Sequence, residues 1–126
     1  MSWQTYVDQN LVGTGHIAQG AICGAAGEVW AESTAGFVGA DEGAKVAKGF
    51  TDPSSLLGQS FHLQGEKYLT IKIADNVIYG KKGPAGVTIA KSGQAIVIGT
   101  YGDGQQPGNC NIVVEGLKDY LVSVGY

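Results

Sequence analysis

The sequence contains no arginine, so all eight of its basic side chains are lysines, and its formal net charge is −3 at pH 7. Because contact with nucleic-acid phosphates requires clustered cations, this balance argues against a nucleic-acid binder. No run approaches the roughly 20 apolar residues of a membrane-spanning helix, and no charged-then-apolar leader opens the chain. We therefore expect a cytoplasmic protein that binds no nucleic acid.

Residues that bind metals or act as nucleophiles are also few. Cys23 and Cys110 are far apart, with no CxxC spacing, and His16 and His62 form no ligand spacing with them. We expect two buried, reduced thiols, no metal site and no cofactor. The sequence also lacks a GxSxG elbow, an HExxH motif and a complete phosphate-binding loop. We therefore expect no enzyme, and a small hydrolase that uses Cys23 or His62 is kept only as an alternative.

Glycine, in contrast, is abundant. The chain has 21 glycines and only three prolines among 126 residues. Glycine at this density without a fixed period indicates tight turns between short strands. With 44% hydrophobic residues the chain can bury a core, and its length fits a single domain over residues 1–126.

Both ends of the chain favour helices. Residues 2–12 begin with a serine suited to an N-cap, and the three-residue spacing of Trp3 and Tyr6 places them on one helical face. Residues 109–124 carry apolar side chains at helical spacing. Two shorter helices are predicted between these, over residues 41–50 and near residues 52–55.

The middle of the chain alternates with period two, as strands do. Predicted strands cover residues 61–63, 68–73, 77–79, 86–90 and 95–98, with turns at residues 64–65 and 75–76. An earlier hairpin is predicted from residues 20–24 and 28–32. Successive hairpins form an antiparallel meander, and helices at both ends can pack on one of its faces. The predicted class is α+β.

Large aromatic residues fall on the two terminal helices and on the early hairpin. They are Trp3, Tyr6, Trp30, Tyr120 and Tyr126. One interpretation is ordinary core packing. The other is that the two helices lie side by side and present the rings as an exposed platform. Such a platform suits a polyproline II ligand, which arrives preordered and has free carbonyls that tyrosine and tryptophan can bind.

The lysines are unevenly distributed. Residues 67–91 hold five of the eight lysines and a single acidic residue, Asp75. Lysines on solvated strand edges, where they discourage aggregation, would explain this pattern. The alternative is a binding surface for an acidic protein or for anionic lipid headgroups.

Three separated motifs resemble the profilin family, whose members are small actin-monomer-binding proteins. The motifs are the opening MSWQTYVD, the stretch IYGKKG followed by GVTI, and QPGNCN leading into VVE and DYL. The opening is typical of plant and amoeboid profilins, and the resemblance covers essentially the whole chain. It implies an α/β/α sandwich: a central antiparallel sheet with the N- and C-terminal helices on one face and the short helices on the other.

The resemblance also implies two binding faces. A poly-L-proline groove carries over onto Trp3, Tyr6, Asn10, Trp30, Tyr120 and Tyr126. An actin-binding face carries over onto Lys67, Lys72, Lys82, Gln106, Gly108, Asn111 and Glu115. Phosphoinositide binding carries over onto Lys81, Lys82 and Lys91.

The function implied by this resemblance is stoichiometric. The protein would bind monomeric actin 1:1, sequester it from spontaneous nucleation, and dock on proline-rich, formin-like assembly factors and on phosphoinositides at the membrane surface. It would act as a monomer in the cytoplasm, at the cytoskeleton and the cell cortex. The alternative is a profilin-like interaction or lipid-sensing module without actin activity.

Overall fold

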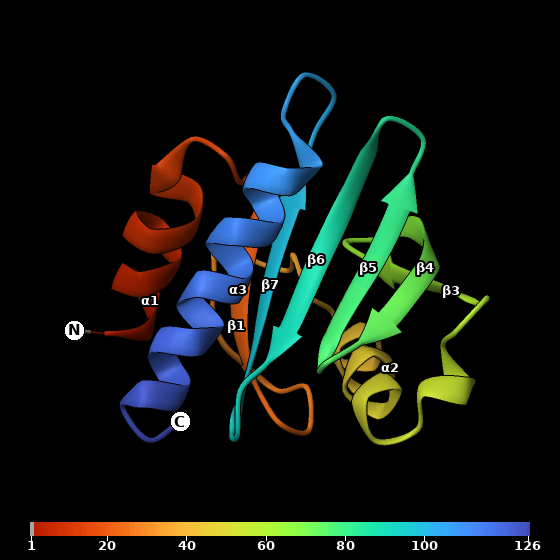
Figure 1. The fold of residues 1–126 in the computed structure, drawn as a ribbon, viewed down its shortest axis with the longest axis horizontal. Coiled ribbons are helices and arrows are strands. Elements are labelled where there is room, and N and C mark those ends of the chain that lie inside the picture. Colours follow the sequence, from red (N-terminus) through yellow and green to blue (C-terminus); the bar gives the residue numbers. More distant parts are fainter. Residues whose placement is uncertain (1) are drawn as a thin grey trace.

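The computed structural model describes residues 2–126, and the strands in that range form one antiparallel sheet (Figure 1). The strands are β1 (Gly20–Gly24), β2 (Val29–Glu32), β3 (Ser60–Leu63), β4 (Glu66–Ala74), β5 (Val77–Lys82), β6 (Ala85–Lys91) and β7 (Ala95–Tyr101). Their order in the sheet is β2-β1-β7-β6-β5-β4-β3. Strands β3 to β7 form the predicted meander, and the early hairpin joins it because β1 pairs with β7. The predicted sheet is confirmed.

The predicted helices are also present. The N-terminal helix runs through α1 (Trp3–Thr5), a π-helical segment (Tyr6–Leu11) and a 3₁₀ turn (Val12–Thr14). The others are α2 (Ala40–Thr51), the 3₁₀ turn η3 (Pro53–Ser55) and α3 (Pro107–Ser123). The Ser2 hydroxyl caps the first helix by accepting the Thr5 N–H at 3.1 Å. Helix α3 begins two residues earlier than predicted, because Pro107 suits a first helical turn.

Two tight turns set the register of the meander. Gln64 and Gly65 have φ of 53° and 74°, and Asp75 and Asn76 have φ of 53° and 62°. Positive φ at both central residues is the geometry of the two-residue hairpin turn that follows the twist of the strands. Both turns lie at the predicted positions.

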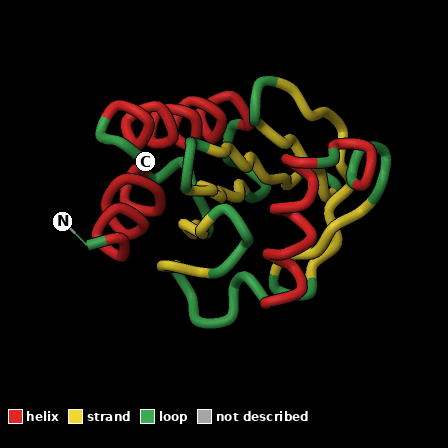
Figure 2. The backbone as a smooth tube through the Cα atoms, turned by 90° about the horizontal axis from the view of Figure 1, so that it is seen from below, coloured by secondary structure: helices red, strands yellow, loops and turns green. Residues whose placement is uncertain are grey.

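The sheet separates two cores. On one face Phe61 and Ile78 pack against Val46 of α2. On the other face Val7 of the N-terminal helix and Val114 of α3 lie in one cluster. Figure 2 shows the two terminal helices next to each other on one side of the strands and α2 on the other. This is the predicted sandwich of helices on both faces of a sheet.

Helix α3 lies closest to β7. A Cβ atom at Gly99 of β7 would stand 2.5 Å from the Cγ2 atom of Val114, so the glycine permits this close approach. The helix packs on β6 and β7 and leaves the neighbouring part of the same face open. Leu69 and Ile71 of β4 are accordingly 49% and 53% exposed. Within residues 2–126, no helix combines the length and apolar character needed to cross a membrane.

Candidate functional site

Aromatic rings from the N-terminal helix, β2 and the C-terminal segment meet at one place. The Trp3 ring centroid lies 4.8 Å from that of Trp30, 4.9 Å from that of Tyr126 and 5.8 Å from that of Tyr6. Tyr6 and Tyr120 follow at 6.0 Å. These spacings are typical of interacting aromatic pairs. We call these five residues the aromatic platform.

The platform lies at the surface. Tyr120 and Tyr126 are 47% and 41% exposed, and the rings of Trp3, Tyr6 and Trp30 are half-buried. The platform covers the core on the side of the terminal helices, because its inner edges pack against that cluster. The outer faces of the rings are therefore available to a ligand.

A groove of about 470 Å³ extends the platform between the N-terminal helix and α3. Tyr6 and Tyr120 belong to both features, and Asn10, the predicted rim residue, lies in the groove lining. The groove also contains Ile112, which is 72% exposed and was absent from the predicted site. The sequence could have indicated Ile112, because an apolar residue outside the buried stripe of a helix faces solvent or a ligand. The buried stripe of α3 is Cys110, Val114, Leu117 and Leu121.

The tyrosine hydroxyls of the platform can donate hydrogen bonds. The pKa of Tyr6 is raised above its ordinary value, chiefly by hydrogen bonding with Tyr120 and to a lesser extent by desolvation. The Tyr6 hydroxyl is therefore protonated at neutral pH. A ligand with free carbonyl oxygens would find a donor at the boundary of platform and groove.

The open face of β4 and β5 forms a second surface. Lys72 pairs with Tyr79 across the two strands, and its Nζ lies 5.9 Å from the Tyr79 ring centroid. The Tyr79 hydroxyl donates to Glu115 of α3 at 3.1 Å. The pKa of Tyr79 is raised, chiefly by burial and to a lesser extent by the charge of Glu115. Lys72 and Glu115 therefore lie on the same side of the sheet.

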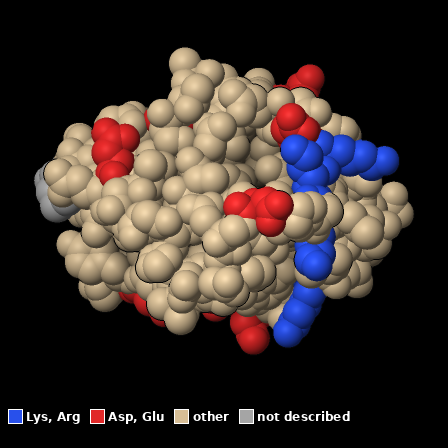
Figure 3. All heavy atoms as spheres, turned by 90° about the horizontal axis from the view of Figure 1, so that it is seen from above, with Lys and Arg blue, Asp and Glu red and all other residues tan. Residues whose placement is uncertain are grey.

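A bulge in β4 is responsible for this arrangement. The register between β4 and β5 shifts between Thr70 and Lys72, so Ile71 is an extra residue. Simple alternation from the buried Tyr68 would direct Lys72 toward α2, and the extra residue turns it to the α3 side. The residues exposed on this side are Lys67, Leu69, Ile71, Lys72 and Lys81, which we call the basic strand face. Figure 3 shows lysine side chains gathered in a band on the side of the molecule that carries β4 and β5.

The beginning of α3 adjoins the basic strand face. A cavity of about 380 Å³ lies between them, and Lys72, Lys81 and Asn111 are part of its lining. Thr88 of β6 hydrogen-bonds to Asn111 and holds that side chain toward the sheet. Gln106 is the N-cap residue of α3, and Gly108 is exposed in its first turn.

The profilin family model matches the chain over residues 1–126. The chain belongs to the profilin family. Profilin-A of Physarum polycephalum is 51% identical over 126 residues and covers 100% of both chains. The crystal structure of Acanthamoeba castellanii profilin II matches with a TM-score of 0.95 and 47% identity, covering 99% of this chain and 100% of that chain.

Mouse profilin IIa in complex with a double repeat from the FH1 domain of mDia1 matches over 100% of both chains, with a TM-score of 0.74 and 21% identity. At that identity the likeness shows the fold alone. Profilins are non-enzymatic actin-binding regulators, which agrees with the function class predicted from the motifs.

Two predicted lysines lie away from the basic strand face of this profilin. Lys82 follows Lys81 in β5, so its side chain points to the opposite, α2 side of the sheet. There its Nζ lies 2.7 Å from Glu66 Oε2, and that hydrogen bond raises the pKa of Lys82. Lys91 is the last residue of β6 and lies six residues, or roughly 20 Å, along the strand from the β5–β6 turn. Its Nζ donates to the carbonyls of Ser92 and Gly93. The structure therefore does not bring Lys81, Lys82 and Lys91 together.

Both cysteines are buried, as predicted. Burial raises the pKa of Cys23 to about 12 and that of Cys110 to about 11. Both thiols therefore remain protonated near neutral pH, and a protonated thiol is a poor nucleophile. Within the described range, no three His, Cys, Asp or Glu side chains are placed to hold a metal ion.

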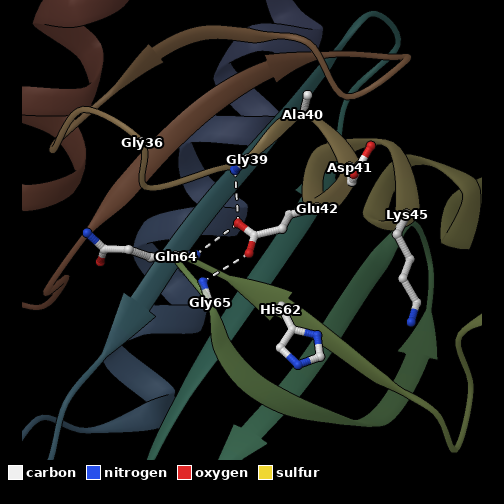
Figure 4. Close-up of a pocket in the computed structure, with 9 residues that line it drawn as sticks. All are labelled: Gly36, Gly39, Ala40, Asp41, Glu42, Lys45, His62, Gln64 and Gly65. Atoms are coloured by element: carbon white, nitrogen blue, oxygen red, sulfur yellow. Dashed lines mark hydrogen bonds between the residues drawn. The ribbon is translucent and has the colours of Figure 1, made fainter.

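The hollow of about 750 Å³ beside α2 contains a carboxylate with a structural role (Figure 4). Glu42 accepts the backbone N–H groups of Gly39, Gln64 and Gly65, each at 2.9 Å. Burial acts to raise the pKa of Glu42, but these three bonds outweigh it, so that the pKa is lowered. Glu42 thereby ties the first turn of α2 to the β3–β4 turn.

This anchor predicts a pH dependence. A carboxyl whose pKa is lowered by folding contributes stability above its unfolded-state pKa of about 4.3, and that stability is lost as pH falls through the lower folded-state value. Between about pH 5 and pH 3, we expect the free energy of unfolding of Glu42→Gln to fall less steeply than that of the native chain. Urea unfolding at stepped pH measures both slopes.

Asp41→Asn is the control for this experiment, since it changes the charge of the same helical turn and leaves the three Glu42 bonds in place. Equal slopes for Glu42→Gln and the native chain would show that the anchor does not depend on ionisation.

Proposed function

We propose that this chain binds monomeric actin 1:1 and docks on proline-rich ligands through a separate surface, thereby regulating filament assembly. Membership of the profilin family supports actin binding. The observation that carries the proline proposal is the meeting of five aromatic rings from three elements at one exposed site. We expect the protein to work in the cytoplasm, at the cytoskeleton and cell cortex.

The aromatic platform suits a polyproline II helix. Such a ligand has three residues per turn and a rise of about 3.1 Å, and its carbonyls make no internal hydrogen bonds. Stacked prolines would lie against the outer ring faces, while the Tyr6 hydroxyl and the indole N–H groups could donate to the carbonyls. Because the ligand arrives ordered, binding costs little conformational entropy. The complex of mouse profilin IIa with a double repeat from the FH1 domain of mDia1 supports a peptide ligand for this fold.

Trp3 is the residue to test first, since its ring contacts three others of the platform. We expect Trp3→Ala to weaken binding of a proline decamer by about 30-fold or more, as loss of a central aromatic anchor does. Actin binding should be preserved. Titration followed by the fluorescence of Trp30 measures the decamer affinity, with a Gly/Ser peptide as the ligand control.

Leu57→Ala is the matched variant, because it removes an exposed apolar side chain near α2. Loss of both proline and actin binding in a Trp3→Ala protein would mean that Trp3 supports the core instead of a ligand site.

For actin we propose the basic strand face together with the beginning of α3. The surface combines the exposed apolar side chains of Leu69 and Ile71 with flanking lysines, which suits a stable contact with a folded, acidic protein. The positive charge would mainly accelerate the encounter. Asn111 and Glu115 are held by bonds to Thr88 and Tyr79, so they would contact actin without further ordering.

Lys72→Glu tests this surface. We expect it to weaken the binding of monomeric actin by about tenfold or more, since it places a like charge against an acidic partner. Fluorescence anisotropy of the labelled protein in non-polymerising buffer measures the affinity. Lys45→Glu makes the same charge change on α2 and should leave actin affinity unaltered. Equal losses in both variants would show that only net charge matters.

Phosphoinositide binding is the third part of the proposal, with Lys81, Lys82 and Lys91 as its predicted residues. Lys81 has the best support, because Lys67 and Lys72 share its face and each lysine near an anionic membrane adds about 1 kcal/mol. We expect Lys81→Glu to weaken sedimentation with phosphoinositide vesicles, whereas Lys91→Glu should have little effect. Equal loss in Lys91→Glu would show that one headgroup site does not explain binding.

The two protein-binding surfaces would allow one molecule to hold both partners. The platform and the basic strand face involve different residues, so neither ligand needs to displace the other. A bridged complex would raise the effective concentration of actin at a proline tract. A profilin-like module without actin activity would instead bind the decamer and remain unaffected by monomeric actin.

A further inference from the structure

Tyr126 reaches the aromatic platform although it lies beyond the end of α3. The chain reverses at Gly125, whose φ is 96°, and the Tyr126 N–H donates to the Leu121 carbonyl at 2.8 Å. The Tyr126 ring thereby meets Trp3 edge-on at 4.9 Å and Trp30 at 6.5 Å. The Tyr126 ring is 41% exposed and follows the last helical turn, so its position also depends on how its main chain is held.

The turn between β6 and β7, residues 92–94, supplies that support. The Ser92 hydroxyl has two acceptors in reach, the main-chain oxygen of Tyr126 at 2.9 Å and the Ala95 carbonyl at 3.2 Å, and Tyr126 is the nearer. The Gln94 N–H donates to the same Tyr126 oxygen. The Gln94 side chain reaches the Gly125 carbonyl at 3.4 Å. In Figure 1 this turn lies beside the C-terminal end of α3.

The turn is itself rigidly built. Ser92 is only 5% exposed, and its hydroxyl oxygen accepts the Ala95 N–H at 3.0 Å. The Lys91 ammonium donates to the Ser92 carbonyl at 3.2 Å and to the Gly93 carbonyl at 3.0 Å. A Cβ at Gly93 would stand 3.1 Å from the Tyr126 oxygen, so a glycine permits the close approach. These contacts give Lys91 a role in the turn that charge distribution alone did not suggest.

We propose that Ser92 is a positioning residue for the proline site, which acts by holding Tyr126 against Trp3 and Trp30. The inference rests on the proposed proline binding and adds to it the β6–β7 turn, which contributes no ring to the platform. A ring that is already in place need not be ordered when the ligand binds, and this ordering cost would otherwise weaken affinity. The turn is thus a part of the site that acts without touching the ligand.

The turn that contains Ser92 lies away from the basic strand face. Ser92 follows Lys91 at the end of β6 remote from the β5–β6 turn. Lys81 pairs with Gly86 next to that turn, and Lys72 is level with Thr88 through Tyr79, four residues and roughly 13 Å along β6 from Ser92. A change at Ser92 should therefore alter proline affinity and leave actin affinity unchanged. A general loss of stability would lower both.

A double-mutant cycle tests the proposal. We expect Ser92→Ala to weaken binding of the proline decamer about five- to tenfold in the native background. In a Tyr126→Ala background the same change should alter affinity by less than about twofold, because no ring remains to be positioned. An equal loss in both backgrounds, or no loss in the native one, would overturn the proposal.

Two further variants control for folding. Ser33→Ala removes a partly buried serine that accepts the Gly20 N–H in another turn, and it should leave decamer affinity unchanged at a comparable melting temperature. Ser92→Cys keeps the side-chain shape with a slightly larger atom and replaces a strong donor with a weak one. It should weaken decamer binding in the same direction, under reducing conditions, if Ser92→Ala does not fold.

A ligand-free readout separates this inference from the proposed function. The near-ultraviolet circular dichroism of the Trp3, Trp30 and Tyr126 cluster should change in Ser92→Ala and not in Ser33→Ala. If the native chain failed to bind the decamer, the proposed function would fail, and this spectrum alone would decide whether Ser92 holds the ring. An unchanged spectrum would overturn the positioning role.

Discussion

The close packing of α3 on β7 is the contact on which both proposed surfaces depend. Gly99 lets the helix approach the strand through Val114, and the buried stripe of α3 joins the core of the N-terminal helix. The two ends of the chain thereby lie side by side. One edge of α3 then carries Tyr120 to the aromatic platform, and another carries Glu115 to the basic strand face.

This geometry places two dissimilar surfaces on one small, rigid body. The platform consists of rings in tilted and edge-on contact, whereas the basic strand face consists of lysines around two exposed apolar side chains. Hydrogen bonds between side chains and the main chain anchor segments of this body. Glu42 ties α2 to the β3–β4 turn, and the turn containing Ser92 holds the segment after α3. These contacts hold two segments in place without a ligand, which reduces the entropic cost of binding.

Much of the fold could be predicted from local patterns. The period-two stretches, the turns at residues 64–65 and 75–76 and the apolar stripe of the last helix each follow from side chains that are neighbours in the chain. Family motifs added the order of the layers. Strand alternation alone does not place Lys72, because the bulge at Ile71 turns its side chain to the α3 side. A bulge arises from pairing between strands, so alternation within one strand does not show it.

The sequence by itself determined the elements, the family and the identity of the aromatic platform, since these depend on residue type and short-range spacing. Only the tertiary structure decided which lysines share a face, that Lys91 lies far from Lys81, and that Ser92 contacts Tyr126. The physical reason is that hydrogen bonds and packing between distant segments set these relations. A separation of 34 positions between Ser92 and Tyr126 leaves no periodic signal, although the folded chain brings them within 2.9 Å.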